Sequence, residues 1–347
     1  HERIALSADP GWRPESRLPA NPRDFKTPNY GLNTLGELFT DRQLASLNAF
    51  STIIPELIEK VASDACSSSL SESITPLSSG GCGRRAYGEA LSVYLTFIVG
   101  QMANHSSTIC GWNSPNQQLR STFSRQAVPM TWDYAEVNVF SRSSGSFHSL
   151  FTRMVKGFES LGTTASSGQI IQADAQHAPI PDNALLSTDP PYYDNIGYAD
   201  LSDFFYAWMK RGLSSVYPDL FGLISTPKND ELVATPYRHG GVGAAEKFFM
   251  TGMRAAISNA AQKSSKDYPS AIYYAFKQSE VEQEGISSTG WATFVQAILD
   301  SGFAMVGTWP LRTEKPGRML SVGTNALANS VVLVCRKKEQ TAVTITR

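Results

Sequence analysis

The stretch Ala184-Leu185-Leu186-Ser187-Thr188-Asp189-Pro190-Pro191-Tyr192 combines a short apolar strand with a rigid turn. Two consecutive prolines have fixed φ angles and lack N–H donors, so they end the strand directly after Asp189. An Asp, Asn or Ser followed by two prolines and an aromatic residue arises by chance in about 1% of chains of this length. A simple proline turn is the alternative interpretation, but ligands in open α/β sheets bind at such strand ends.

The segments around this stretch predict an α/β fold. A helix is predicted from Trp291 to Ser301, with Gly302 ending it. Strands that alternate with helices favour a mostly parallel sheet. The last two strands have no predicted helix between them and favour an antiparallel pair at the sheet edge. Besides residues 184–188, the predicted strands are 169–173, 271–276, 305–309 and 330–335.

Residues 1–160 are predicted to form a mainly helical segment with an extended lead-in, and residues 161–347 an α/β core. Thr40 and Gln43 have the spacing of a capping box, and apolar residues follow at helical spacing. Pro55 predicts a bend or break in that helix.

The composition excludes several classes of protein. The net charge of -1 over 347 residues excludes a chain that coats nucleic acid through bulk charge. No apolar run approaches the ~18 residues of a membrane span, and the charged, proline-rich start does not resemble a signal peptide. We therefore expect a cytoplasmic protein without membrane contact. The four cysteines include no C-x2-C pair, so no metal site is predicted.

Methyl transfer to an exocyclic amine is the chemistry that fits the motif. Such an amine is a poor nucleophile because its lone pair is delocalised into the ring. The carboxylate of Asp189 and the carbonyl of Pro190 can each accept one N–H, which aims the lone pair at a methyl donor. Pro190 and Pro191 fix the direction of that carbonyl. Tyr192 offers a ring on which an extruded base stacks, with about 1–3 kcal/mol per base.

The motif resembles the catalytic motif of amino-methylating DNA methyltransferases. The longer string from Thr188 to Trp208 is similar to the large adenine-specific DNA methylases that contain a zinc ribbon. The resemblance covers nearly all of residues 30–338, with further matches at 38–44, 125–138, 231–238, 308–314 and 323–328. It implies a Rossmann-like S-adenosylmethionine-dependent methyltransferase sheet, N6-adenine methylation of DNA, S-adenosyl-L-methionine as cofactor, and a role in phage defence.

The resemblance also implies roles for single residues. Asp189, Pro190 and Tyr192 take the catalytic and base-stacking roles, with Pro191 completing the motif. Asp174, which with Ala173 ends the predicted strand 169–173, is the candidate that contacts the adenosine of the cofactor, and a turn aspartate is the alternative.

Further residues are candidates for substrate contact from their positions. Residues next to the motif are expected to shape the pocket entry, a loop beside a glycine run to close on DNA, and a strand end to lie at the ligand edge of the sheet. These candidates are Tyr193, Asp194, Tyr198, Arg238 and Lys277. For Arg238 a solvated loop is an equal alternative.

Several parts that the resemblance implies have no match. The glycine-rich methionine-binding loop and the zinc-ribbon cysteines are absent, and the glycine run 240–243 is predicted to be a mobile loop instead. Five strands are predicted where the methyltransferase sheet has seven. Together with a first residue that is not Met, this predicts the C-terminal portion of a longer protein. Alternatively, a partner subunit supplies the glycine-rich loop and the missing strands, or their sequences have diverged.

Two other functions remain open. N4-cytosine methylation of DNA uses the same chemistry. A non-catalytic nucleic-acid-binding or assembly module that needs a partner for cofactor binding is the other alternative. Residues 311–347 carry seven Lys and Arg against two acidic residues, a local charge of +5 (7 minus 2). This basic tail favours contact with DNA phosphates, with a solubilising tail as the alternative.

Overall fold

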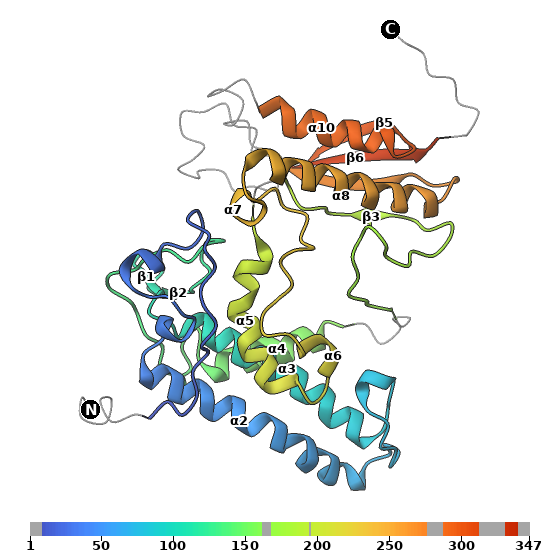
Figure 1. Cartoon of the computed structure of the whole chain (residues 1–347). Helices are drawn as coiled ribbons and strands as arrows, with labels where there is room; N and C mark the ends of the chain where they lie inside the picture. Colours follow the sequence, from blue (N-terminus) through green and yellow to red (C-terminus); the bar gives the residue numbers. More distant parts are fainter. Residues whose placement is uncertain (1–8, 162–167, 194–195, 276–286, 312–329, 339–347) are drawn as a thin grey trace. The chain divides into compact units, whose positions relative to one another are not determined.

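The computed structural model describes residues 9–161, 168–193, 196–275, 287–311 and 330–338 (Figure 1). The chain forms two compact units. Unit 1 comprises His1–Ser166 and Tyr198–Lys228, and unit 2 comprises Ser167–Gly197 and Asn229–Arg347. This division differs from a single boundary near residue 160, because residues 198–228 belong to unit 1.

Three helices form the centre of unit 1, namely α2 (Asp41–Asp64), α3 (Arg84–His105) and α5 (Tyr198–Leu213). Both α2 and α3 contact α5. Trp208 of α5 is 1% exposed, so burial of its large apolar surface ties this helix to unit 1. The following segment is also tied to α5, because the Lys228 Nζ pairs with the Asp203 carboxylate at 2.6 Å.

The start of α2 confirms the predicted capping box. The Thr40 hydroxyl accepts a hydrogen bond from the backbone N–H of Gln43, and the Gln43 side chain accepts one from the N–H of Thr40. Of the two outcomes predicted at Pro55, a bend or a break, the break does not occur, since α2 continues to Asp64. Apolar residues on both sides of the proline, Ile54 and Ile58, stay buried and hold the helix together despite the lost hydrogen bond.

Short elements complete unit 1. A two-stranded antiparallel sheet pairs β1 with β2, and the lead-in is largely irregular, as predicted. The remaining elements are η1 (Thr27–Tyr30), η2 (Gly36–Leu38), η3 (Ala65–Ser67), η4 (Leu77–Ser79), β1 (Gly111–Asn113), β2 (Gln118–Arg120), α4 (Phe147–Glu159) and α6 (Pro218–Phe221).

Unit 2 contains a mixed four-stranded sheet in the order β3-β4-β6-β5. The strands are β3 (Ser187–Thr188), β4 (Ser270–Ala275), β5 (Phe303–Leu311) and β6 (Ser330–Lys337). β3 and β4 are parallel, and β6 is antiparallel to both of its neighbours. The predicted antiparallel pairing of the last two strands is therefore confirmed. β6 does not lie at the edge, however, because it fills the space between β4 and β5.

One predicted strand is wrong and another is shorter than predicted. Residues 169–173 form no strand, and the side chain of Ile170 is 100% exposed. Among the described residues no neighbouring strand takes up their backbone N–H and C=O groups, and a strand requires that pairing. β3 covers two of the five predicted residues, and Ala184 forms an isolated bridge to Ser264.

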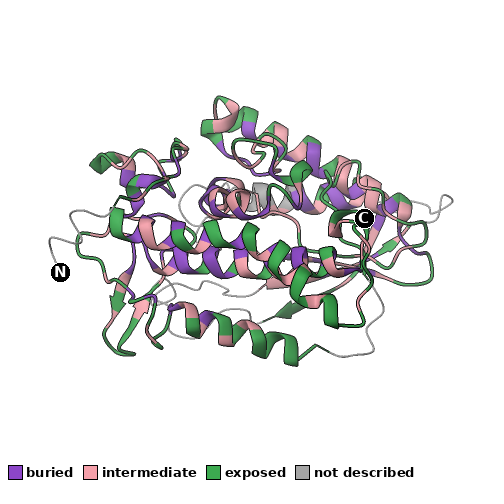
Figure 2. Cartoon of the chain, turned by 90° about the horizontal axis from the view of Figure 1, so that it is seen from below, coloured by how far each residue is buried: buried purple, intermediate pink, exposed green. Residues whose placement is uncertain are grey.

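Two helices, α8 (Val242–Lys263) and α10 (Ser287–Asp300), pack on one face of this sheet. Burial alternates along β4, so that Ile272 and Tyr274 point into the core. Around them lie large apolar side chains from both helices and from β6, including Phe249, Met253, Phe294, Ile298 and Leu333. Figure 2 colours the described residues by burial, and buried and exposed residues interleave along the helices in view.

The glycine run 240–243 is not a loop. Gly240 ends the short helix α7 (Pro236–His239) with φ 76°, and Gly241 precedes α8 with φ 139°. Because other residues rarely adopt such φ angles, the two glycines allow a sharp turn directly between two helices. By contrast, Gly302 follows α10 with φ 95°, and the predicted helix end is confirmed.

The described structure is thus a mixed α/β fold, as predicted at the level of fold class. Among the described residues, none of the helices combines the length and apolar content needed to cross a membrane.

Replacing Thr40 tests the cap of α2. We expect Thr40→Ala to lower the free energy of unfolding by about 0.5–2 kcal/mol, because the N–H of Gln43 loses its acceptor. Thr40→Ser keeps a hydroxyl and should stay close to the parent chain. Urea denaturation of the three proteins measures the difference, and equal stability of the Ala and Ser variants would contradict the role of the cap.

The reactivity of the four cysteine thiols tests which of them are buried in the folded chain, including Cys335 of β6. Cys66 and Cys82 are exposed, whereas Cys110 and Cys335 are buried. Burial raises the pKa of the Cys335 thiol to about 11, so about one molecule in a thousand is ionised there at pH 8.

We therefore expect a disulfide reagent at pH 8 to modify two thiols rapidly in the folded chain and four after denaturation. The Cys66→Ser/Cys82→Ser double variant should lose the rapid phase. A rapid phase that persists in this variant would show that at least one of the two buried thiols, Cys110 or Cys335, is accessible to the reagent.

Candidate functional site

The Asp-Pro-Pro-Tyr motif follows β3 directly, at its carboxyl end. The parallel pairing sets Thr188 opposite Ile272, so the motif continues alongside the carboxyl end of β4. The ring of Tyr192 contacts that of Tyr274 with centroids 5.2 Å apart and an angle of 66°. The motif is therefore positioned by strand pairing and by an aromatic contact with the core of unit 2.

Tyr193, the residue after the motif, is held by contacts with α8 and with Ala234. The Tyr193 ring lies 5.2 Å from that of Phe249 in α8, nearly perpendicular to it. Its carbonyl accepts a hydrogen bond from the N–H of Ala234 at 2.9 Å. Tyr193 has φ 37°, a left-handed conformation that costs a non-glycine residue about 1–3 kcal/mol. Such strain persists where the surroundings enforce it and is typical of functional sites.

The carboxylate of Asp189 is exposed and engaged within the motif. The Tyr192 hydroxyl donates a hydrogen bond to Asp189 Oδ1 at 2.6 Å. A carboxylate has several lone pairs on its two oxygens, so Asp189 keeps the capacity to accept an N–H from a substrate. The motif thus presents an acceptor to solvent next to an aromatic ring, the two groups that the proposed chemistry requires.

Asp174 lies in a turn and not at a strand end. Its carboxylate accepts hydrogen bonds from the N–H of Gln176 at 3.0 Å and lies 3.2 Å from His177 Nδ1. The Gln176 N–H is the main cause that lowers the pKa of the Asp174 carboxyl. Asn259 of α8 donates to the carbonyls of Ala175 and Ala178, which holds the turn on the helix.

This position separates Asp174 from the motif. The turn of Asp174 meets α8 at Asn259, whereas Tyr193 meets α8 at Phe249. These two helix positions are ten residues apart, which corresponds to about 15 Å along the axis. The expected strand 169–173 would have brought Ala173 and Asp174 to the ligand edge of the sheet. Without that strand, their cofactor role stays a prediction.

Arg238 is engaged in an ion pair. Its Nη1 lies 2.6 Å from Glu231 Oε2, and its side chain is 7% exposed. The guanidinium also donates to the Tyr237 hydroxyl at 3.1 Å. A buried guanidinium that is paired with a carboxylate is poorly placed to contact a phosphate, so the structure favours a structural role in α7 over closure on DNA.

The structure does not test the other predicted substrate contacts. Tyr198 belongs to unit 1, as the first residue of α5, and is 57% exposed. Asp194 and Lys277 lie outside the described residues, as does most of the basic tail. The described part of that tail is Arg336, Lys337 and Lys338, and each donates a hydrogen bond to a backbone carbonyl of unit 2.

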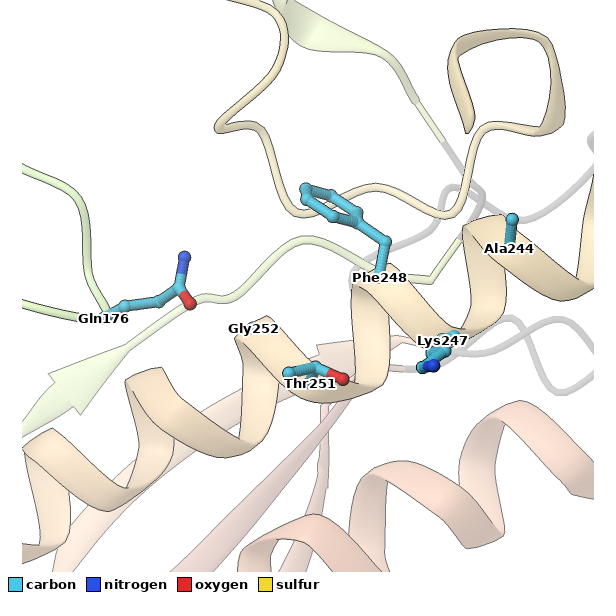
Figure 3. A pocket seen from close by; sticks show the side chains of 6 residues that line it. All are labelled: Gln176, Ala244, Lys247, Phe248, Thr251 and Gly252. Atoms are coloured by element: carbon cyan, nitrogen blue, oxygen red, sulfur yellow. The ribbon is translucent and has the colours of Figure 1, made fainter. Parts of the chain in front are cut away.

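A pocket of about 390 Å³ lies on the outer side of α8 (Figure 3). Phe248, one of its walls, stacks on His239 with ring centroids 4.1 Å apart. Lys247 is the one charged residue of the lining, and no motif residue contributes to it. The lining residues are Gln176, Ala244, Lys247, Phe248, Thr251 and Gly252. Because no residue of the Asp-Pro-Pro-Tyr motif lines this pocket, it is separate from the candidate site for methyl transfer.

Sequence reasoning missed Tyr274 and Phe249 as neighbours of the motif. Tyr274 lies near the end of a predicted strand, which places it at the edge of the sheet where ligands bind. Its contact with Tyr192, however, depends on which strand pairs with β3, and the sequence does not show that pairing. Within the described residues no group of three or more His, Cys, Asp and Glu side chains is arranged to hold a metal ion. Comparison with known proteins found no matching family model, curated protein or solved structure.

Proposed function

We propose that this chain is the catalytic portion of an S-adenosylmethionine-dependent N6-adenine DNA methyltransferase. The observation that carries the proposal is the exposed Asp189 carboxylate beside the Tyr192 ring, at the carboxyl end of a strand in a mixed α/β sheet. The similarity of the string from Thr188 to Trp208 to adenine-specific DNA methylases supports the same substrate. A sheet that is parallel except for β6 is compatible with the Rossmann-like fold that this similarity implies.

Each residue of the motif has its own role in binding the adenine that accepts the methyl group. An adenine that is extruded from the duplex stacks on Tyr192, which excludes water from one of its faces. Its N6 amine donates one N–H to Asp189 and one to the carbonyl of Pro190. The two acceptors draw the nitrogen toward tetrahedral geometry and expose its lone pair. After the transfer, the amine carries an extra proton, and Asp189 is a base that can take it up.

S-adenosylmethionine, when bound, supplies an electrophilic methyl group. The described residues do not form a complete site for it. Asp174 lies in a turn on α8, at a distance from the motif, and the sequence contains no match to the glycine-rich methionine-binding loop. We therefore derive the acceptor side of the reaction from this chain and assign the donor side to a further segment or partner subunit.

The free edge of β3 is the place where that segment fits. The carbonyl of Leu186 accepts from Ala271 on the β4 side. Backbone groups alternate in direction along a strand, so those of Leu185 and Ser187 face the opposite edge, where no described strand pairs. Parallel strands are normally buried on both sides, yet the Leu185 side chain is 71% exposed. A strand added there would end next to Asp189.

One observation favours a second candidate, a nucleic-acid-binding or assembly module without catalysis. The hydroxyl of Tyr192 already donates to Asp189, and the described residues offer no cofactor site, so this chain on its own need not be active. N4-cytosine methylation would use the same acceptors and is separated from adenine methylation by the product.

Replacing Asp189 tests the assignment of the reaction. In the complete protein, we expect Asp189→Ala to lower methyl transfer to duplex DNA by about 100-fold or more, because the amine loses an acceptor and a base. Transfer of radioactive methyl from S-adenosylmethionine gives the rate, and mass spectrometry of nucleosides distinguishes N6-methyladenine from N4-methylcytosine.

The matched control is Asp182→Ala. Asp182 is another exposed aspartate of unit 2 and pairs with Lys263 at 2.7 Å, outside the motif, so its loss should leave the rate unchanged. Undiminished methylation by Asp189→Ala would overturn the assignment.

Calorimetry tests the division between acceptor and donor sides. We expect S-adenosylmethionine to bind weakly or not at all to residues 1–347 alone and to bind the complete protein or complex. Tight binding to residues 1–347 alone would show that this chain contains the whole cofactor site.

A further inference from the structure

We propose that Tyr274 is a positioning residue that holds the ring of Tyr192 for base stacking. This inference rests on the proposed function, because it concerns the placement of an extruded base. Tyr274 does not belong to the motif and is separated from it by 82 residues (274 minus 192). Its role follows from three features of unit 2, namely strand register, core packing and the hydrogen bond within the motif.

Strand register places Tyr274 level with the motif. Ile272 is opposite Thr188 in the parallel pair of β3 and β4. Two residues further along both strands, Tyr274 is level with Pro190. The side chain of Tyr274 shares the core face with that of Ile272, since burial alternates along β4. Main-chain pairing alone therefore brings this aromatic ring beside the motif.

Core packing immobilises Tyr274. Its ring stacks on that of Phe294 in α10, with centroids 4.2 Å apart and an angle of 19°. Trp291, one helical turn earlier, lies 5.7 Å from it. Tyr274 is 2% exposed and Phe294 is fully buried. A ring that is packed in this way cannot swing, so its contact with Tyr192 forms a fixed wall at the motif.

Tyr192 is thereby held at two points. Its ring meets Tyr274 at an angle of 66°, and its hydroxyl donates to Asp189 at 2.6 Å. The ring contact and the hydroxyl bond together fix the orientation of the Tyr192 ring. The same two constraints set the distance between the stacking ring and the acceptor carboxylate. A base that stacks on Tyr192 is then aligned with Asp189.

The test compares variants of Tyr274 in the complete protein. Tyr274→Leu and Tyr274→Met remove the ring and keep an apolar side chain, and Tyr274→Phe keeps the ring. We expect the two ringless variants to lower kcat by about 10- to 100-fold through misplacement of Tyr192. Tyr274→Phe should restore the rate of the parent protein, because Phe keeps the ring that contacts Tyr192.

A spectroscopic signal separates positioning from a general loss of structure. A duplex with 2-aminopurine at a mapped methylation site fluoresces when that base is extruded, and stacking on Tyr192 quenches it. Bound to the ringless variants, the duplex should be brighter than with the parent protein or with Tyr274→Phe. Phe303→Leu removes another buried ring of the same core, on β5, and should leave both the signal and kcat unchanged below its melting temperature.

The outcomes distinguish the two proposals. If Asp189→Ala is inactive while both ringless variants keep the kcat and fluorescence of the parent protein, Tyr274 has no positioning role and the proposed function stands. If Tyr274→Phe is as impaired as the ringless variants, the hydroxyl and not the ring is needed, which also overturns the inference. Full activity of Asp189→Ala overturns the proposed function itself.

Discussion

The parallel pairing of β3 with β4 is the constraint on which the candidate site depends. It is short, since Ser187 and Thr188 alone form the regular part of β3, yet it determines what lies next to the motif. A parallel pair directs both carboxyl ends to the same edge of the sheet. As a result, the Asp-Pro-Pro-Tyr turn and Tyr274 are neighbours, although they are far apart in the sequence.

The core supports that pairing from one side of the sheet. Rings from α10 and β4 form a continuous packed column that begins at Phe294, passes through Tyr274 and ends at Tyr192. The column links the buried interior, where side chains are immobile, to an exposed carboxylate at the surface. In physical terms, apolar packing provides the rigidity that the proposed reaction at Asp189 would need, and the two prolines supply the local stiffness.

Several features of this arrangement could be predicted from local patterns. The capping box at Thr40 involves residues three apart, and the helix end at Gly302 needs a single glycine. The apolar runs of β4, β5 and β6 likewise involve residues close in sequence. The motif itself was visible because two prolines after an aspartate are rare. Interpretations that depended on distant partners failed: residues 169–173 have the composition of a strand but no described neighbour, and the glycine run at 240–243 joins two helices.

By itself, the sequence determined the proline turn after Asp189, the functional groups that the motif presents, and the α/β class of the fold. These features rest on fixed proline φ angles, on side-chain functional groups and on short-range periodicity. Only the tertiary structure decided that β6 lies between β4 and β5, that α5 packs in unit 1, and that Tyr274 stands beside Tyr192. Strand order and register arise from burial summed over many residues that are distant in sequence, and no local pattern encodes that sum.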